Sequence, residues 1–387
     1  MSPVAVRSRD PHPLAARWEE RVMRGAHPVA YPLLNAARRP VLRVPGLGVL
    51  VRDPALLRAT LMNTASFTKT GPGSPSDLWT PVLGAAVLLN MEGAGHLSLR
   101  RKLSSLFAPS YVEPLAAATL PMGELTRRLR AGDAVDMVAE AKRHASAMIA
   151  TLVGLDAVDD QLFDRVSTIT RFVRLSRPRL TPTQVVVARG ILDELTAHAR
   201  AAYRAGDEST VPGRMRSLDL SEDEAMGAVG AFVLTGTETL VSYIPRLVAL
   251  LVDSGWFDDI AVDRSLAEPA IAEGLRVTTP SPVMLRSVVA NDSIGDVAVR
   301  PGDRVILATF AANRGLGPFD PATNVAATLR QLWFGAGTHF CLGAPLAMAQ
   351  IRLTLDALLD AGPVRIASRR VARGVLIPAY ASLVVAT

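Results

Sequence analysis

The chain has almost no cysteine, since Cys341 is the only one among its 387 residues. A single thiol cannot form an intramolecular disulfide, which is the expected state of a protein in a reducing compartment. It also excludes zinc and iron–sulfur sites that are built from several cysteines. Any metal bound by this thiol therefore has a single sulfur ligand from the chain.

Lysine and aromatic residues are scarce as well. Lys69, Lys102 and Lys142 are the only lysines, so the formal net charge of +6 comes almost wholly from arginine, and aromatic residues make up 5% of the chain. The basic residues are scattered and not interleaved with aromatics, which argues against a nucleic-acid surface. We expect no nucleic-acid partner.

The first residues lack the continuous apolar run of a signal peptide or membrane anchor, because prolines and arginines interrupt residues 1–24. The most apolar long stretch, residues 225–252, contains Glu238, Pro245 and Arg246. Charged residues and a proline within an apolar stretch are more typical of a core helix than of a membrane span. We therefore expect a cytoplasmic protein without a membrane anchor.

Hydrophobic residues make up 49% of the chain, enough for the core of one large domain. We expect a single domain over residues 1–387, with a flexible start at residues 1–15. Ala- and Leu-rich segments with apolar residues three and four apart predict helices through most of the chain. Three regions are β-branched or alternating and predict strands, namely residues 41–52, 303–310 and 364–385. The predicted fold class is mainly α with small β-sheets.

Cys341 lies in a glycine-rich loop, Phe334 to Gly343, that leads into an apolar helix. Gly335 and Gly337 remove side chains where the backbone turns sharply or approaches a flat ligand. The nearby helix N-terminus is expected to lower the pKa of the thiol and to favour the thiolate. A haem iron needs one protein ligand on its proximal side, so a lone thiolate suits it. The alternative is an inert buried thiol in a glycine-rich turn.

This loop resembles the cysteine loop of the cytochrome P450 family, FGxGxHxCxG, and every fixed position is present. The resemblance implies the P450 fold, with haem b between the long central helix and the cysteine-loop helix. It also implies that Cys341 is the axial ligand of the iron. The other loop residues that it assigns to cofactor binding are Phe334, Gly335, Gly337, His339 and Gly343.

A second motif, residues 235–239 with the sequence TGTET, lies in the long helix that a capping box opens at Ser221. Gly236 costs about 1 kcal/mol relative to Ala inside a helix, so it indicates that the backbone opens there. The motif is similar to the family's oxygen-activating helix, which implies that Glu238 and Thr239 are catalytic and deliver protons to the co-substrate O2. The alternative is a threonine bonded back to the preceding turn beside an ion-paired glutamate.

Glu273 and Arg276 are three residues apart, so on a helix they share a face and can pair. They match the family's structural ion pair, which braces the core beneath the haem. The family adds a second arginine before the cysteine loop, and Arg330 is a poorly placed candidate for it.

Haem carries carboxylates, which need cationic partners when buried. His96 and Arg100 are four apart and match the family's HxxxR element, and the resemblance adds Arg286 and His339 as further partners. The alternative for each is a surface cation or a structurally satisfied histidine.

The resemblance implies a haem-thiolate monooxygenase that inserts one atom of O2 into a hydrophobic small molecule, such as a polyketide, steroid or terpenoid of secondary metabolism. Hydroxylation is the first expectation; epoxidation, phenol coupling, peroxide-driven oxidation and a non-catalytic helper role are alternatives. The substrate-pocket candidates that the resemblance implies are Leu88, Leu89, Phe172, Ala231, Leu234, Thr235, Val283, Met284 and Tyr380.

The chain contains no recognisable flavin, nicotinamide or iron–sulfur segment. Electrons from NAD(P)H should therefore arrive through separate proteins, a ferredoxin and its reductase. An acidic ferredoxin would dock near the cysteine side, where Arg101, Lys102 and Arg352 offer positive charge. We expect the protein to be a monomer.

Overall fold

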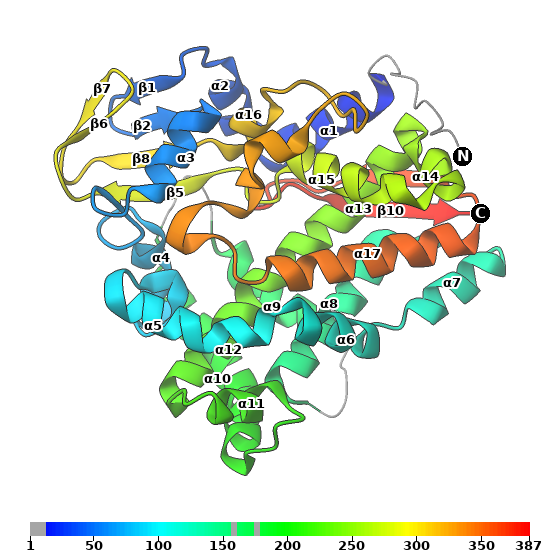
Figure 1. Cartoon of the computed structure of the whole chain (residues 1–387), viewed down its shortest axis with the longest axis horizontal. Coiled ribbons are helices and arrows are strands. Elements are labelled where there is room, and N and C mark those ends of the chain that lie inside the picture. Colours follow the sequence, from blue (N-terminus) through cyan, green and yellow to red (C-terminus); the bar gives the residue numbers. More distant parts are fainter. Residues whose placement is uncertain (1–12, 156–160, 174–178) are drawn as a thin grey trace.

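The computed structural model describes residues 13–155, 161–173 and 179–387, and it confirms a mainly α fold with small sheets (Figure 1). The larger sheet lies at one side of the molecule, away from the helices α10 and α11 (Figure 1). The helices are α1 (Pro13–Ala26), α2 (Ala30–Ala36), α3 (Pro54–Met62), α4 (Pro75–Leu83), α5 (Gly93–Ser104), α6 (Pro109–Thr119), α7 (Met122–Arg130), α8 (Met137–Val153), α9 (Leu162–Arg171), α10 (Pro182–Ala205), α11 (Val211–Ser217), α12 (Glu222–Gly236), α13 (Glu238–Ser254), α14 (Trp256–Val262), α15 (Ala267–Thr278), α16 (Thr309–Arg314) and α17 (Ala344–Ala361).

The central helix consists of α12 and α13, which follow each other with a break at Thr237. The predicted capping box opens α12, because Ser221 Oγ accepts from the Glu224 amide at 3.2 Å while Glu224 Oε2 accepts from the Ser221 amide at 2.8 Å. The stretch Glu222–Ser254 is long and apolar enough to cross a membrane by length and composition, but 67% of its most apolar window is buried inside the protein. It is therefore the core helix that the sequence predicts.

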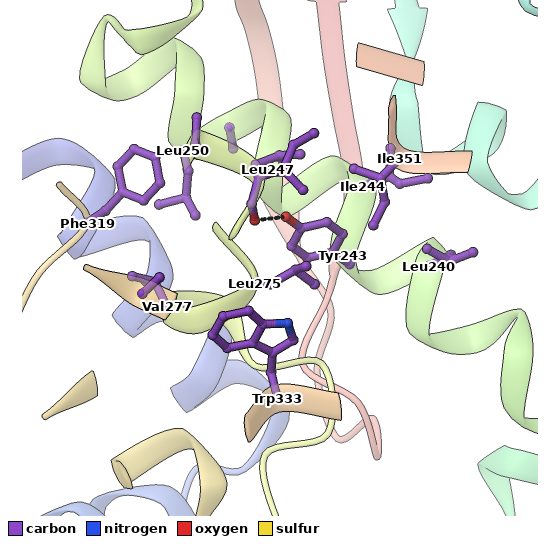
Figure 2. Packing of buried hydrophobic residues seen from close by; sticks show 14 of the residues in the cluster. Leu240, Tyr243, Ile244, Leu247, Leu250, Leu275, Val277, Phe319, Trp333 and Ile351 are labelled. Atoms are coloured by element: carbon purple, nitrogen blue, oxygen red, sulfur yellow. Dashed lines mark hydrogen bonds between the residues drawn. The ribbon is translucent and has the colours of Figure 1, made fainter. Parts of the chain in front are cut away.

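The main core surrounds α13 (Figure 2). Tyr243, Leu247 and Leu275 pack there with Trp333, which precedes the cysteine loop, and Ile351 of α17. The Tyr243 hydroxyl donates to the Ile271 carbonyl of α15 at 2.9 Å, so the buried phenol has a partner. This packing holds α15 and α17 against the central helix, which fixes the position of the cysteine loop between them.

A second core lies on the other side of α12, where α8, α9, α10 and α11 pack around it. Phe163, Leu192 and Met215 from three of these helices are buried with Val229 of α12. The two cores meet along the central helix, which leaves the break at Thr237 between them.

The five-stranded sheet has the order β1 (Val41–Val44), β2 (Gly48–Val51), β8 (Arg304–Leu307), β5 (Met284–Val288) and β3 (Phe67–Thr68). A three-stranded sheet has the order β4 (Val135–Asp136), β10 (Tyr380–Ala386) and β9 (Arg365–Val371). The hairpin of β6 (Asp292–Ile294) and β7 (Val297–Val299) stands apart. The strands expected in residues 41–52 and 364–385 are confirmed. The expectation for residues 303–310 is wrong at its end, because Phe310 lies in α16, where its ring packs against Tyr31.

Of the start that the sequence predicts to be flexible, Pro13–Ala15 begin α1, and residues 1–12 lie outside the described residues. Glu19 of α1 is buried and accepts from Arg246 Nη2 of α13 at 2.6 Å. Arg246 is fully buried and also donates to the Pro378 carbonyl at 3.2 Å. This ion pair fastens the amino-terminal helix and the carboxyl-terminal turn to the central helix.

Candidate active site

The cysteine loop is held in shape by two glycines with positive φ. Gly335 has φ +84° and Gly337 has φ +68°, a region that residues with a Cβ rarely adopt. A Cβ at Gly337 would also lie 3.1 Å from the Leu61 carbonyl oxygen of α3. The Cys341 amide then donates to the Phe334 carbonyl at 2.9 Å, which closes the loop three residues before the start of α17.

The surroundings of the Cys341 thiol act on its pKa in two directions. The Cys341 side chain is accessible to water, yet burial raises the pKa of the thiol, although the amides of Gly343 and Ala344 and the charge of Arg100 act in the opposite direction. The sulfur is therefore surrounded by protein but not covered by it. The predicted lowering of this pKa is wrong for the chain alone, because the loss of bulk water outweighs the helix N-terminus.

Phe107 connects the cysteine loop to the central helix. A Cβ at Gly343 would lie 3.8 Å from Phe107 Cε1, and the Phe107 ring meets Phe232 of α12 edge to face at 4.9 Å between centroids. Within the loop, Phe334 and Phe340 also pack edge to face at 6.1 Å. Aromatic rings thus line the region between Cys341 and α12.

The helix break presents an open face. At Gly236, apart from its chain neighbours and the backbone of its own helix, no atom of the described residues lies within 4 Å of the position that a Cβ would take. Thr235 and Thr237 both donate back to the preceding turn, to the carbonyls of Ala231 at 2.7 Å and Val233 at 3.0 Å. For Thr239, in contrast, the described part of the chain supplies no hydrogen-bond partner. Its hydroxyl is therefore free to bind a small ligand, unlike the bonded-back threonine of the alternative reading.

Glu238 is hydrogen-bonded and not ion-paired among the described residues. Its Oε1 accepts from Thr170 Oγ1 of α9 at 2.6 Å. Burial raises the pKa of the carboxyl, while the Thr170 hydrogen bond and the charges of Arg171 and Lys142 partly offset this. A carboxyl with a raised pKa retains its proton to higher pH, as a proton donor requires.

The predicted cationic residues come together from three elements. His96 and Arg100 lie on α5, and Arg286 lies on β5. The rings of His96 and His339 are 4.3 Å apart between centroids, and Arg100 Nη2 donates to the Phe340 carbonyl at 2.7 Å. The structure therefore places all four residues beside the cysteine loop.

Two further members of this cluster, Lys69 and Glu92, escaped the sequence analysis. Glu92 Oε2 lies 2.7 Å from His339 Nε2, and its Oε1 accepts from the Lys69 amide at 2.6 Å. Lys69 follows β3, whose Thr68 pairs with Ser287 of β5, next to Arg286. The available signals were that Lys69 is one of three lysines in an arginine-rich chain and that Glu92 directly precedes the helix of His96.

This cluster holds more basic groups than acidic ones, and the pKa values of its members reflect that imbalance. Burial, together with the charge of Arg286, lowers the pKa of Lys69 to about 8, and burial lowers the pKa of Arg286 to about 10. Burial and the neighbouring His339, Lys69 and Arg100 lower the pKa of His96 to about 4. Burial would raise the pKa of Glu92, but hydrogen bonds from His339, the Lys69 amide and Thr68 lower it to about 2.

The ion pair of Glu273 and Arg276 forms as predicted, with both residues fully buried. Arg276 Nε donates to Glu273 Oε2 at 2.6 Å and Nη2 donates to Oε1 at 2.5 Å. The third partner is not an arginine: Asn324 Nδ2 donates to Glu273 Oε1 at 2.8 Å. Arg330 contacts neither residue, and its carbonyl instead faces Arg58 Nη1 at 3.5 Å.

The substrate-pocket candidates come from several elements around the central helix and the cysteine loop. Leu88 packs against the second core, and the preceding Val87 approaches Gly227 of α12. Met284 lies 3.9 Å from the position of a Cβ on Gly335, beside the cysteine loop. The remaining candidates of this group are Leu89 next to Leu88, Phe172 at the end of α9, Ala231, Leu234 and Thr235 on α12, and Val283 before β5.

Tyr380 is the exception. Its ring packs against Trp18 of α1 at 6.4 Å and its hydroxyl bonds to Arg369, so the side chain belongs to the main core. The assignment of Tyr380 to the substrate pocket is therefore wrong for its ring.

These residues fit a haem. The Cys341 thiol is accessible, and the space where a Cβ would lie on Gly236 is open. The buried Nδ1 of His339 lacks a partner within the described residues, and the cations around it outnumber the acid. A planar ligand that carries carboxylates would satisfy both features.

Comparisons with known proteins agree with this geometry. The family model of cytochrome P450 matches residues 261–364, which include the ion pair and the cysteine loop. The erythromycin C-12 hydroxylase of Saccharopolyspora erythraea is 27% identical over 321 residues, 78% of this chain and 79% of the relative. The mycinamicin IV hydroxylase/epoxidase of Micromonospora griseorubida is 27% identical over 347 residues, 84% and 80% of the two chains.

Solved structures share the fold along nearly the whole chain. The P450 EryK mutant bound to erythromycin B has a TM-score of 0.77 at 24% identity and covers 94% of this chain and 97% of its own. P450BioI in complex with an acyl carrier protein has a TM-score of 0.81 at 21% identity, with 96% and 100% covered.

Proposed function

Because the chain belongs to the cytochrome P450 family, we propose that it is a haem-thiolate monooxygenase that inserts one atom of O2 into a hydrophobic small molecule. Hydroxylation is the first expected outcome, and epoxidation on the same iron is the second. The observation that carries this proposal is the accessible Cys341 thiol in the glycine-rich loop before α17, beside the cluster of His339, His96 and Arg100.

When bound, the haem supplies O2 activation, and the thiolate donates electron density that favours O–O cleavage. The side chain of Cys341 would hold the iron, while His96, Arg100, Arg286 and His339 would hold the carboxylates. Phe334, Gly335, Gly337 and Gly343 would shape the loop beneath the ring.

Proton delivery falls to Glu238 and Thr239. Burial raises the pKa of the Glu238 carboxyl, which favours its protonated form, and Thr170 holds it in place. The Thr239 hydroxyl, which lies next in the chain, has no competing acceptor among the described residues. It can therefore orient a small ligand at the helix break and pass on a proton. Positioned groups of this kind contribute roughly 100- to 10,000-fold to a rate.

The substrate class follows from the pocket and from the relatives. The pocket candidates other than Thr235 are apolar, and such a surface suits a hydrophobic natural product better than a sugar. The two relatives are named for hydroxylation of an erythromycin and for hydroxylation or epoxidation of a mycinamicin. A polyketide, steroid or terpenoid of secondary metabolism is the substrate class that we propose.

Electrons would reach the haem from NAD(P)H through a ferredoxin and a ferredoxin reductase, with the protein acting as a cytoplasmic monomer. Of the proposed docking residues, Lys102 is already paired with Glu224 at 3.3 Å, and Arg352 is paired with Glu268. Arg101 is exposed on α5 and has no acidic partner within the described part of the chain. Arg101 is therefore the strongest of the three charges for an acidic donor.

The proposal is tested by supplying the purified protein with a surrogate ferredoxin, its reductase and NADPH under ¹⁸O2, with substrates chosen by ligand-induced spin-state shifts. We expect a product that gains one ¹⁸O atom. A product that loses two hydrogens without gaining oxygen would instead indicate phenol coupling. Product formation from hydrogen peroxide alone, at the same rate, would contradict dependence on a redox partner.

A further inference from the structure

Lys69 is held beside the cysteine loop by its backbone. Its amide donates to Glu92 Oε1 at 2.6 Å, and its carbonyl accepts from the Ser76 amide at 3.1 Å. The side chain is only partly accessible to water. Within the described residues its ammonium has no hydrogen-bonded acceptor and no ion pair. A half-buried ammonium without an acceptor, on a backbone held by two hydrogen bonds, indicates a partner that the described residues do not supply.

The immediate neighbours identify the kind of partner. Arg286 and Arg100 act on Lys69 as like charges, and Glu92 is the one carboxylate that acts on it. Lys69, Arg100 and Arg286 carry three positive charges, and Glu92 carries one negative charge. The Cys341 thiolate also acts on Lys69, but it is assigned to the iron, so the surplus left for a further anion is two. The two histidines, His96 and His339, are not included in this surplus. A surplus of two equals the charge of the two propionate carboxylates of haem b.

Glu92 explains why a third cation is needed. It accepts from Thr68 Oγ1 at 3.1 Å and bonds to His339 at 2.7 Å, and so it ties β3 to the cysteine loop. This link adds a negative charge beside the place where the carboxylates of the haem would lie. With Arg100 and Arg286 alone, the surplus of positive charge would be one, and one carboxylate would remain uncompensated.

We propose that Lys69 is a third cationic ligand of the haem carboxylates in this chain and that it offsets the charge of Glu92. This inference rests on the proposed function, because it requires that haem is bound. A carboxylate on the substrate is the competing partner for the same ammonium, and the test separates the two.

The test compares the haem-loaded protein with Lys69→Met, Glu92→Gln and the double variant. Glutamine removes the charge and keeps an acceptor for the Lys69 amide, while its NH2 group takes the place of the oxygen that faces His339. Haem loss is followed by transfer to excess apomyoglobin, and the reduction potential is followed by spectroelectrochemistry. The matched control is Lys142→Met, because Lys142 lies on α8 and pairs with Asp164 at 2.9 Å.

We expect Lys69→Met to release haem about tenfold faster or more, as for a buried charge that loses its partner, and to lower the reduction potential because a positive charge is lost. The double variant should recover most of the retention, and Lys142→Met should behave as the parent. Equal haem release and equal potential in Lys69→Met would overturn the inference. Unchanged haem release with weaker binding of carboxylate-bearing ligands would overturn it in favour of the substrate.

A failure of the proposed function would look different. The parent itself would then lack a thiolate-type spectrum when reduced and exposed to carbon monoxide, whatever the behaviour of Lys69→Met.

Discussion

Glu238 and Thr239 differ from the threonines around them in their hydrogen bonds. The hydroxyls of Thr235 and Thr237 donate to carbonyls of the preceding turn. Glu238 instead accepts a hydrogen bond from Thr170 of α9, and Thr239 has no acceptor among the described residues. The motif alone allowed either arrangement, because a threonine in a helix can bond back or point away. The structure favours a proton-delivery pair for this reason.

Glu238→Gln removes the proton donor but keeps the size of the side chain. We expect turnover to fall by about 100-fold or more, while the spectrum of the reduced, carbon-monoxide-treated protein stays that of the parent. Steady-state product formation with a saturating redox chain measures this. Turnover within a factor of two of the parent would contradict the assigned role.

Thr170→Val should shift the pH dependence of turnover. The Thr170 hydrogen bond lowers the pKa of Glu238, against burial, which raises it. Loss of this bond raises the pKa further, so the limb on which activity falls with rising pH should move to higher pH. A pH–rate profile of both proteins measures this. A shift to lower pH, or none, would show that Thr170 does not set the protonation of Glu238.

The residues of the site differ in how well the sequence alone predicts them. Cys341 and the capping box at Ser221 can be predicted because their meaning depends on neighbours in the chain. Lys69 and Glu92 cannot, because Glu92 meets His339 across 247 positions. The direction of the pKa shift of Cys341 could not be predicted either, because it depends on burial by distant segments.

At the scale of elements, α15 combines two functions. It packs on α13 through Leu275 and carries the pair of Glu273 and Arg276. Asn324 replaces the expected arginine as the third partner, and an amide can do this because Glu273 Oε1 needs only a donor. The sequence showed the pair because its spacing is local, whereas Asn324 lies 51 positions away. Short strands such as β3 could not be predicted either, because two residues are too few to show an alternating pattern.

Glu273→Ala should destabilise the protein strongly. It leaves Arg276, which has no exposed surface, without its carboxylate, and such a loss costs about 3–5 kcal/mol. Urea unfolding and the haem content after purification measure the effect. The control is Glu268→Ala, which breaks an exposed pair with Arg352 and should cost less than about 1 kcal/mol. Similar losses in both variants would contradict the structural role of the buried pair.

At the scale of the whole molecule, the distribution of charge matters for the electron donor. The net charge of +6 is spread over the chain, and many arginines are paired on the surface, so composition alone does not define a docking face. The helical class and the cysteine loop were predictable from pattern. The pairing state of Lys102 and Arg352 was not, because their acids lie 122 and 84 positions away.

Arg101→Glu should slow reduction by an acidic ferredoxin at low salt, because an unpaired surface charge acts on association. The difference should shrink as ionic strength rises and screens the charge. Stopped-flow reduction across a salt series measures this. Arg373→Glu is the control, since Arg373 is exposed on the turn between β9 and β10 and the net charge changes equally. Equal slowing in both variants would argue against docking at α5.

The central claim is that Cys341 is the axial ligand of a haem iron. The most direct measurement is the visible spectrum of the purified protein after reduction with dithionite and exposure to carbon monoxide, beside that of Cys341→Ser. The account predicts a strongly red-shifted Soret band in the parent that is absent from the variant. A parent without haem, or a band that the substitution leaves unchanged, would contradict thiolate ligation and the monooxygenase function with it.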